Sequence, residues 1–218
     1  MTTLLTENKK MRKSGGDKFR VFDFAIPAYQ ARSGLKTCPL AGTCKNGCYA
    51  KQGPYTWTST QDAFENRLAT ILDGSFGNKM EKEIRTKLKT ADKRGQQLVI
   101  RIHSSGDMFS LDYLKQWLEV IEAFPTVQFY SYTKMVPLFK RYGKLPSNFT
   151  VIFSEGGIAD NKIADNDRHA RVFESLEALE AAGYDNAMED DTVAFTSQSG
   201  KIGLYYHGAQ SKLWTTAG

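Results

Sequence analysis

The stretch "QLVIRIHSSGDMFSLDYLKQWLEVIEAFPTVQFYSYTK", Gln97–Lys134, carries the pattern that decides the fold. It begins with a short apolar run (97–102) and continues with apolar residues at the spacing of an amphipathic helix (110–123). It ends with a second apolar run (126–133). A strand, a helix and a strand joined by short connections are typical of a parallel βα unit. The stretch therefore predicts an α/β fold.

The same alternation of strands and helices extends to both sides of this unit. The other predicted elements are a strand (19–28), two helices (59–74 and 77–95), a short helix (136–145), a strand (149–157), a helix (170–184) and two closing strands within 191–208, as a hairpin around Ser199–Gly200. The chain should thus contain about six strands, mostly parallel.

About six such strands fit either a doubly wound sheet or a partial (β/α) barrel with its helices on the outside. In the strand 97–102, Arg101 shares a face with His103, opposite two isoleucines, as expected where one face lines a polar lumen. Other strands also end in polar residues, at Ser131–Lys134, Ser154–Glu155 and Thr196–Ser197. This favours the barrel, and we expect a small-molecule cofactor or substrate at the rim formed by the carboxyl ends of the strands.

All three cysteines of the chain lie within residues 38–48, with the spacing C-x5-C-x3-C. Three cysteines cannot all form disulfides, and the surrounding glycines and prolines indicate a loop that can fold its thiolates around one point. We interpret Cys38, Cys44 and Cys48 as metal ligands. Structural zinc usually takes two short-spaced pairs, and a second pair is missing here. A 4Fe-4S cluster held by three thiolates of one loop is therefore preferred.

Zinc remains the alternative, because a distant histidine could complete a site with three cysteines and one histidine. The histidines of the chain are far apart in the sequence: His103, His169 and His207. We expect His103 to point into the lumen beside Asp107 as a ligand or proton carrier, or else to be a hydrogen-bonded strand end.

Three further residues are candidates for the rim. Lys134 and Glu155, at adjacent strand ends, would form an ion pair across the rim or grip a substrate. Tyr49 follows the third cysteine and would cover the cluster from water. Aromatic residues interleaved with cations can also stack on bases, but covering the cluster is the simpler role.

Composition and charge predict a soluble, intracellular protein with one α/β domain (19–218) that carries the loop 38–48. No apolar run is long enough to span a bilayer, and the N-terminus lacks the apolar core of a signal peptide. The net charge is +5, and residues 1–20 hold six cations against two acids. We therefore expect residues 1–18 to form a flexible basic arm that contacts nucleic acid weakly.

The order of strand, three-cysteine loop, helix and parallel βα units resembles the radical S-adenosylmethionine (radical SAM) enzymes. In that superfamily a C-x3-C-x2-C loop follows the first strand, and a Gly-Gly-Glu motif after the second strand binds the amino group of S-adenosylmethionine. Ser105-Gly106-Asp107 occupies that place here, with a carboxylate suited to an ammonium partner. The resemblance implies a 4Fe-4S cluster and S-adenosylmethionine as cofactors. Here the cysteine spacing is five and three, and Gly47 replaces an aromatic residue before the third cysteine.

A closer resemblance extends over nearly the whole chain. The segments "CPLAGTCKNGCYA", "RIHSSGDMFS", "FYSYTK" and "HARVFES" together resemble the phage "gene product eighty-eight" family. This resemblance implies a bacteriophage or prophage origin and a location in the host cytoplasm. Three functions stay open: an enzyme of the radical-SAM type, a non-catalytic iron–sulfur electron carrier, sensor or nucleic-acid-associated protein, and a zinc-stabilised binding module.

Overall fold

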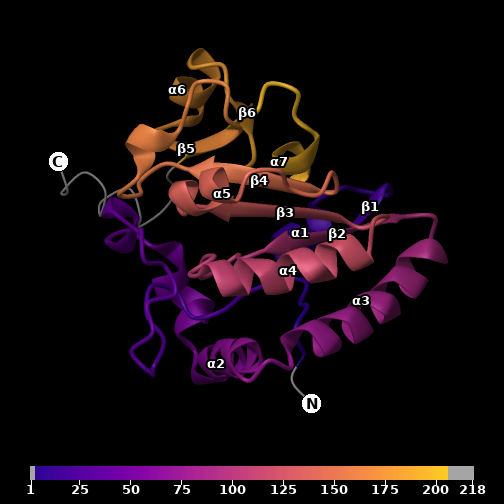
Figure 1. The fold of residues 1–218 in the computed structure, drawn as a ribbon. Coiled ribbons are helices and arrows are strands. Elements are labelled where there is room, and N and C mark those ends of the chain that lie inside the picture. The colour runs from indigo at the N-terminus through magenta and orange to yellow at the C-terminus, as the bar shows by residue number, and fades with distance from the viewer. Residues whose placement is uncertain (1–2, 206–218) are drawn as a thin grey trace.

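The computed structural model describes residues 3–205, which form seven strands, several α-helices and short 3-10 turns (Figure 1). The strands are β1 (Phe19–Phe24), β2 (Gln97–Ile102), β3 (Gln128–Thr133), β4 (Phe149–Ser154), β5 (His169–Phe173), β6 (Asp185–Asn186) and β7 (Lys201–Tyr205). They form one sheet in the order β1-β2-β3-β4-β5-β7-β6, and each neighbouring pair is parallel. The sheet curls into a half-barrel with helices around it, so the predicted α/β class and partial barrel are confirmed.

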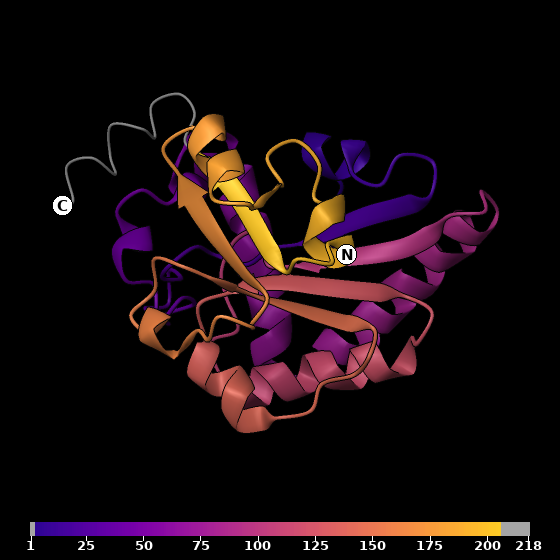
Figure 2. The same cartoon turned by 90° about the horizontal axis from the view of Figure 1, so that it is seen from above.

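The longer helices cover the convex face of the sheet. They are α2 (Thr58–Leu72), α3 (Phe76–Asp92), α4 (Leu111–Ala123) and α5 (Val136–Tyr142), and α3 and α4 run beneath the sheet in Figure 1. The short helices α1 (Lys9–Lys13) and α7 (Thr192–Thr196) lie on the concave side, and α6 (Leu176–Ala181) lies near β5 and β7 (Figure 2). Within residues 3–205 we find no helix with the length and apolar character needed to cross a membrane.

The alternation of side chains along the strands divides the core between the two faces of the sheet. On the convex face, Phe24 of β1 packs edge-on against Phe76 and Trp117, with ring centroids 5.6 and 5.2 Å away. The concave face carries Val21 and Asp23 from the same strand. The convex core is therefore apolar, whereas the concave face keeps charged residues among apolar ones.

Residues 3–18 hold a fixed place in this fold. Leu4 and Leu5 are buried in the convex core, and Met11 of α1 is buried against the concave face. Thr6 forms an antiparallel bridge with β1. The basic charge of this segment predicts a flexible arm. The structure differs because the few apolar side chains of the segment find places in the core on both faces of the sheet.

The last third of the described chain departs from the elements predicted from the sequence. Residues 170–184, expected as one helix, form β5 and then α6, because β5 finds a parallel partner in β7. Residues 192–196, expected in a strand, form α7. Among the described residues no hairpin forms around 199–200, since β7 runs parallel to both of its neighbours. The end of the predicted last strand, 206–208, lies outside the described residues.

Candidate functional site

The cysteine loop connects β1 to α2 and docks against the segment that follows β4. The Cys44 N–H donates to the Gly156 carbonyl at 3.1 Å, and the Ile158 N–H donates to the Leu40 carbonyl at 3.0 Å. Gly42 permits this close approach, since a Cβ at that position would lie 2.9 Å from the Gly156 oxygen. The loop is therefore held at the carboxyl edge of the sheet, between the ends of β1 and β4.

The three thiols are half-buried and not joined by disulfides. Burial raises the pKa of the Cys38 thiol to about 12, and the Asp107 carboxylate and the other two cysteines add to this rise. The Tyr29 N–H donates to the Cys38 sulfur at 3.3 Å. Burial and the neighbouring Cys44 also raise the pKa of Cys48. The thiols thus lie within electrostatic reach of one another.

Two ammonium groups accompany these thiols. Lys51 and Lys134 both lower the pKa of Cys48, although burial outweighs them. Within residues 3–205, no three His, Cys, Asp or Glu side chains are arranged so that they could hold a metal ion. The loop therefore brings the predicted ligands near one another without converging them on one point.

Lys134 and Glu155 lie side by side, but their charged groups do not pair. The Lys134 ammonium donates to the backbone carbonyls of Ser154 and Glu155, at 3.1 and 2.7 Å. The Glu155 carboxylate instead accepts two hydrogen bonds from Arg171, at 2.7 and 3.0 Å. The predicted ion pair across the rim is wrong, because the Glu155 carboxylate forms a bidentate pair with the Arg171 guanidinium on the adjacent strand β5.

Ser105, Gly106 and Asp107 connect the end of β2 to its neighbours. Asp107 is 5% exposed, and its carboxylate accepts three hydrogen bonds, from Thr133 Oγ1 at 2.6 Å, Met108 N at 2.7 Å and Lys134 N at 2.9 Å. Gly106 has φ +82°, and a Cβ there would overlap the Ile26 side chain. Burial raises the pKa of Asp107, although these three hydrogen bonds act in the opposite direction. The three residues therefore serve the packing of the strand ends in this structure.

His103 does not face the lumen. It has φ +67°, which ends the alternation of the strand and turns its side chain to the convex side, where Nε2 lies 2.8 Å from the Tyr113 hydroxyl of α4. Burial lowers the pKa of His103 to about 3. His169, expected to open a helix, opens β5 with Nε2 2.7 Å from the Tyr184 hydroxyl. His207 lies outside the described residues.

Tyr49 bridges the cysteine loop and the end of β2. Its hydroxyl donates to the Ser104 carbonyl, and its ring packs edge-on against Tyr55 with centroids 5.6 Å apart. The residue is 44% exposed, but its hydroxyl is buried, and this burial raises the pKa of the phenol well above its ordinary value. Tyr49 therefore forms part of a wall over the concave face.

A cavity of about 810 Å³ lies between the concave face, the cysteine loop, α1 and α2. Asp23 of β1 and Arg101 of β2 line it and are neighbours in the strand register. The Ser104 hydroxyl, also in the lining, donates to Asp23 Oδ2 at 2.6 Å. The sequence pattern places Arg101 on this face but does not single out Asp23, although a carboxylate inside an apolar strand is itself a signal.

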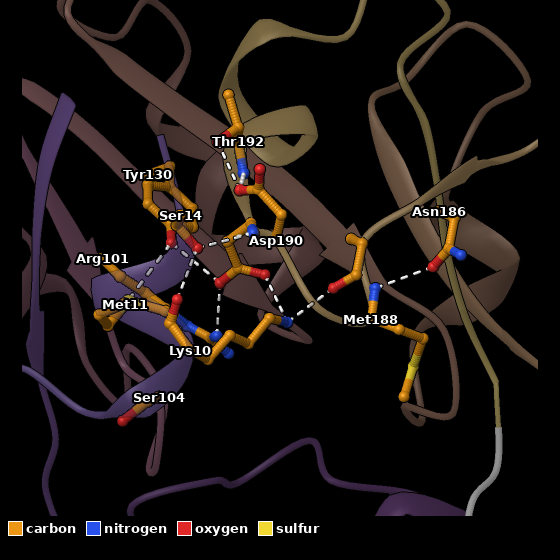
Figure 3. Close-up of polar contacts among 12 residues, drawn as sticks. Lys10, Met11, Ser14, Arg101, Ser104, Tyr130, Asn186, Met188, Asp190 and Thr192 are labelled. Atoms are coloured by element: carbon orange, nitrogen blue, oxygen red, sulfur yellow. Dashed lines mark hydrogen bonds and ion pairs between the residues drawn. The ribbon is translucent and has the colours of Figure 1, made fainter. Parts of the chain in front are cut away.

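Asp191, which precedes α7, contacts charged and polar groups on the concave face. Its partners Lys10, Arg101 and Tyr130 are labelled in Figure 3. Its carboxylate lies 2.7 Å from Lys10 Nζ and 2.6 Å from Arg101 Nη1, and it accepts a hydrogen bond from the Tyr130 hydroxyl at 2.9 Å. Burial opposes ionisation of Asp191, but Arg101 and Lys10 hold its pKa below the ordinary value. This network, which the sequence does not indicate, joins α1, β2, β3 and the start of α7.

Comparisons with known proteins identify a family and a curated relative. A family model described as "Gene product 88" matches residues 2–213. The "Gene 88 protein" of Mycobacterium phage D29 is 38% identical over 132 residues, which cover 54% of this chain and 51% of that protein. The match therefore spans about half the length of that relative. No solved structure matches the chain significantly.

Proposed function

This chain belongs to the gene product 88 family, and from its residues we propose that it is a phage-encoded iron–sulfur protein. Cys38, Cys44 and Cys48 would hold a 4Fe-4S cluster at the carboxyl edge of the half-barrel, in a radical-SAM-like arrangement. One observation carries the proposal. All three cysteines of the chain share one loop, where the charge of one thiol shifts the pKa of another.

The surroundings of the thiols suit the negative charge that such a cluster and its thiolates bring. The Tyr29 N–H donates to the Cys38 sulfur, and the ammonium groups of Lys51 and Lys134 act on Cys48. Hydrogen bonds to sulfur and nearby cations stabilise a reduced cluster. When bound, the cluster would supply one-electron chemistry at the rim.

The proposal requires the loop to adjust as iron binds, because the described side chains do not converge on one point. The 3-10 turn Thr43–Lys45 contains Cys44, and the turn Tyr49–Lys51 follows Cys48. Both are short segments outside the sheet, and a shift of the first would change the hydrogen bond from the Cys44 N–H to the Gly156 carbonyl. Part of the binding energy would then be folding energy of this loop.

Purification without oxygen tests the cluster. We expect a coloured protein with about four iron atoms per chain, as a 4Fe-4S site requires. Cys44→Ser should lose both colour and iron, whereas the neighbouring Thr43→Ser should keep them. A colourless protein that holds stoichiometric zinc would favour the alternative of a zinc-stabilised binding module.

S-adenosylmethionine is a second cofactor in this proposal. Because the Asp107 carboxylate already accepts three hydrogen bonds, Asp107 would position the strand ends rather than bind the ammonium group of the cofactor. Addition of S-adenosylmethionine should change the electron paramagnetic resonance spectrum of the reduced protein. An unchanged spectrum at saturating concentration would favour the non-catalytic alternative, an electron carrier or redox sensor.

The phage family supports the host cytoplasm as the proposed location. A nucleic-acid contact through the basic N-terminal segment is a weaker candidate. Two of its lysines already have partners, since Lys10 pairs with Asp191 and Lys13 with Glu189, each at 2.7 Å.

A further inference from the structure

The cavity on the concave face has the size of a ligand site. Its volume of about 810 Å³ falls within the range of roughly 300–1,000 Å³ that small-molecule sites occupy. Its walls come from β1, β2, α1, α2 and the loop after the third cysteine, and also from β5 and β7. Segments far apart in the sequence therefore enclose one space, at the lumen of the half-barrel.

Two buried polar atoms in the lining have no hydrogen-bond partner among the described residues. They are Oδ1 of Asp23, a residue only 4% exposed, and Nε of Arg101. Buried polar groups in native proteins nearly always have a partner. The other oxygen of Asp23 is bonded to Ser104, and another nitrogen of Arg101 is bonded to Asp191. One acceptor and one donor thus lie unpaired behind the surface of the cavity, and a molecule in the cavity reaches them only if the lining side chains shift.

The charges of the lining favour an anion. Four cations line the cavity (Lys9, Lys10, Arg67 and Arg101), and Asp23 is the acid among the lining residues. Asp191 lies behind the lining and offsets part of the charge of Lys10 and Arg101. A second hollow of about 400 Å³ shares Lys9 and Lys10, and its other charged residues, Lys13 and Glu189, pair with each other and add no net charge. A positively charged lining attracts phosphate or carboxylate groups.

One wall of the cavity is aromatic. Tyr49, Tyr55 and Phe64 line it, with ring centroids 5.6 Å apart for the first pair and 6.1 Å for the second. Adjacent aromatic faces and edges are suited to a planar ring, and stacking on tyrosine is a common way to bind a nucleobase.

From these observations we propose that the lumen binds a nucleotide, with its phosphate near Lys9, Lys10 and Arg101 and its base against Tyr49 and Tyr55. A sugar hydroxyl or base amino group would donate to the buried Oδ1 of Asp23 once the lining side chains shift to admit it. This assignment goes beyond the iron–sulfur proposal and does not depend on it, since none of the three cysteines lines the cavity.

Titration calorimetry on the full chain tests this assignment with the four ribonucleoside monophosphates, their nucleosides and inorganic phosphate. We expect at least one monophosphate to bind about tenfold more tightly than its nucleoside and than phosphate, since a charge-assisted contact is worth about that factor. Equal binding of nucleoside and nucleotide, tighter binding of S-adenosylmethionine, or no binding would overturn the assignment. Affinity for phosphate equal to that for the nucleotide would indicate an unspecific anion site and would also overturn it.

Variants locate the site. Lys9→Ala should weaken nucleotide binding several-fold and leave nucleoside binding unchanged, whereas Lys13→Ala, on the same helix but outside the cavity lining, should change neither. Asp23→Asn should weaken the nucleotide and the nucleoside alike, and thermal unfolding would check that it folds. Equal effects of Lys9→Ala and Lys13→Ala on nucleotide affinity would contradict the placement of the phosphate near Lys9. Calorimetry measures nucleotide binding whether or not the protein holds iron, so this result is separate from the fate of the iron–sulfur proposal.

Discussion

At the scale of single residues, His103 shows how one backbone angle can change a role. A histidine that continued the alternation of β2 would face the charged lumen, but φ +67° places the ring among Phe24 and Tyr113 instead. There the ring is 3% exposed and meets no carboxylate that would favour its charged form. Its contribution is therefore to stability rather than to a proton relay.

His103 should make the free energy of unfolding depend on pH. Its pKa falls from 6.5 to about 3 on folding, so the unfolded chain binds the proton more readily and stability is lost as the pH drops below 6.5. Because of this one group, the free energy of unfolding should fall by about 2 kcal/mol between pH 7 and pH 5. Urea unfolding at both values should show that His103→Asn, which tolerates positive φ, loses this part of the dependence. The same pH dependence in both proteins would contradict the burial of a neutral imidazole.

Asp107 should matter for stability as well as for any ligand. Removal of its carboxylate by Asp107→Ala leaves the Thr133 hydroxyl and two backbone N–H groups without their acceptor. The free energy of unfolding should fall by about 3 kcal/mol. Asp112→Ala, whose side chain is 91% exposed on α4, is the matched control and should change stability by less than about 0.5 kcal/mol. A stable Asp107→Ala protein that fails to bind a cofactor would instead assign the carboxylate to the ligand.

At the scale of elements, the concave network joins parts of the chain that local pattern cannot relate. Asp191→Ala would leave Lys10 and Arg101 buried or half-buried without their counter-charge, and such a change costs about 3–5 kcal/mol. Glu189→Ala removes only the exposed pair with Lys13 and should cost less than about 1 kcal/mol. Denaturant unfolding compares the two variants. Similar losses would mean that the buried network does not hold α1 and α7 in place.

Some elements were predictable because the spacing of their own apolar residues determines whether they form a helix or a strand. The unit β2, α4 and β3 follows from apolar spacing, and the N-cap Ser110 is visible in the sequence. β5 was not predictable in the same way, since its five residues run almost directly into a capped six-residue helix, and its partner β7 lies far along the chain. The short apolar run 192–196 likewise forms a helix because of its place on the concave face.

The candidate site was likewise predictable only in part. The cysteine spacing predicts one shared loop, and the loop docks where the carboxyl ends of parallel strands meet. The neighbours Asp23 and Arg101 come from strands separated by two helices, so only the sheet register brings them together. The close contact of Gly106 with the Ile26 side chain was not predictable either, because a glycine can indicate a close approach but does not show which residue approaches it.

At the scale of the whole molecule, the N-terminal segment holds the two faces of the sheet together. Leu4 and Leu5 complete the convex core, and their N–H groups donate to the Glu83 carboxylate of α3 at 2.8 and 3.1 Å. Met11, seven residues after Leu4, fills the concave core beside Tyr130. A basic segment thus forms part of both cores.

Deletion of residues 2–18 should therefore abolish cooperative unfolding, whereas removal of a flexible tail would leave the unfolding transition unchanged. The deletion removes three fully buried side chains (Leu4, Leu5 and Met11) and Lys10, a counter-charge of Asp191. The single change Met11→Ala should already lower the free energy of unfolding by about 2–5 kcal/mol, as large-to-small core substitutions do. The double variant Lys9→Gln and Lys13→Gln removes two charges and the exposed pair of Lys13 with Glu189, and it should lower the free energy of unfolding by less than about 1 kcal/mol. Far-ultraviolet circular dichroism during urea unfolding measures all three, and a deletion variant with an unchanged midpoint would restore the flexible arm that the charge pattern predicts.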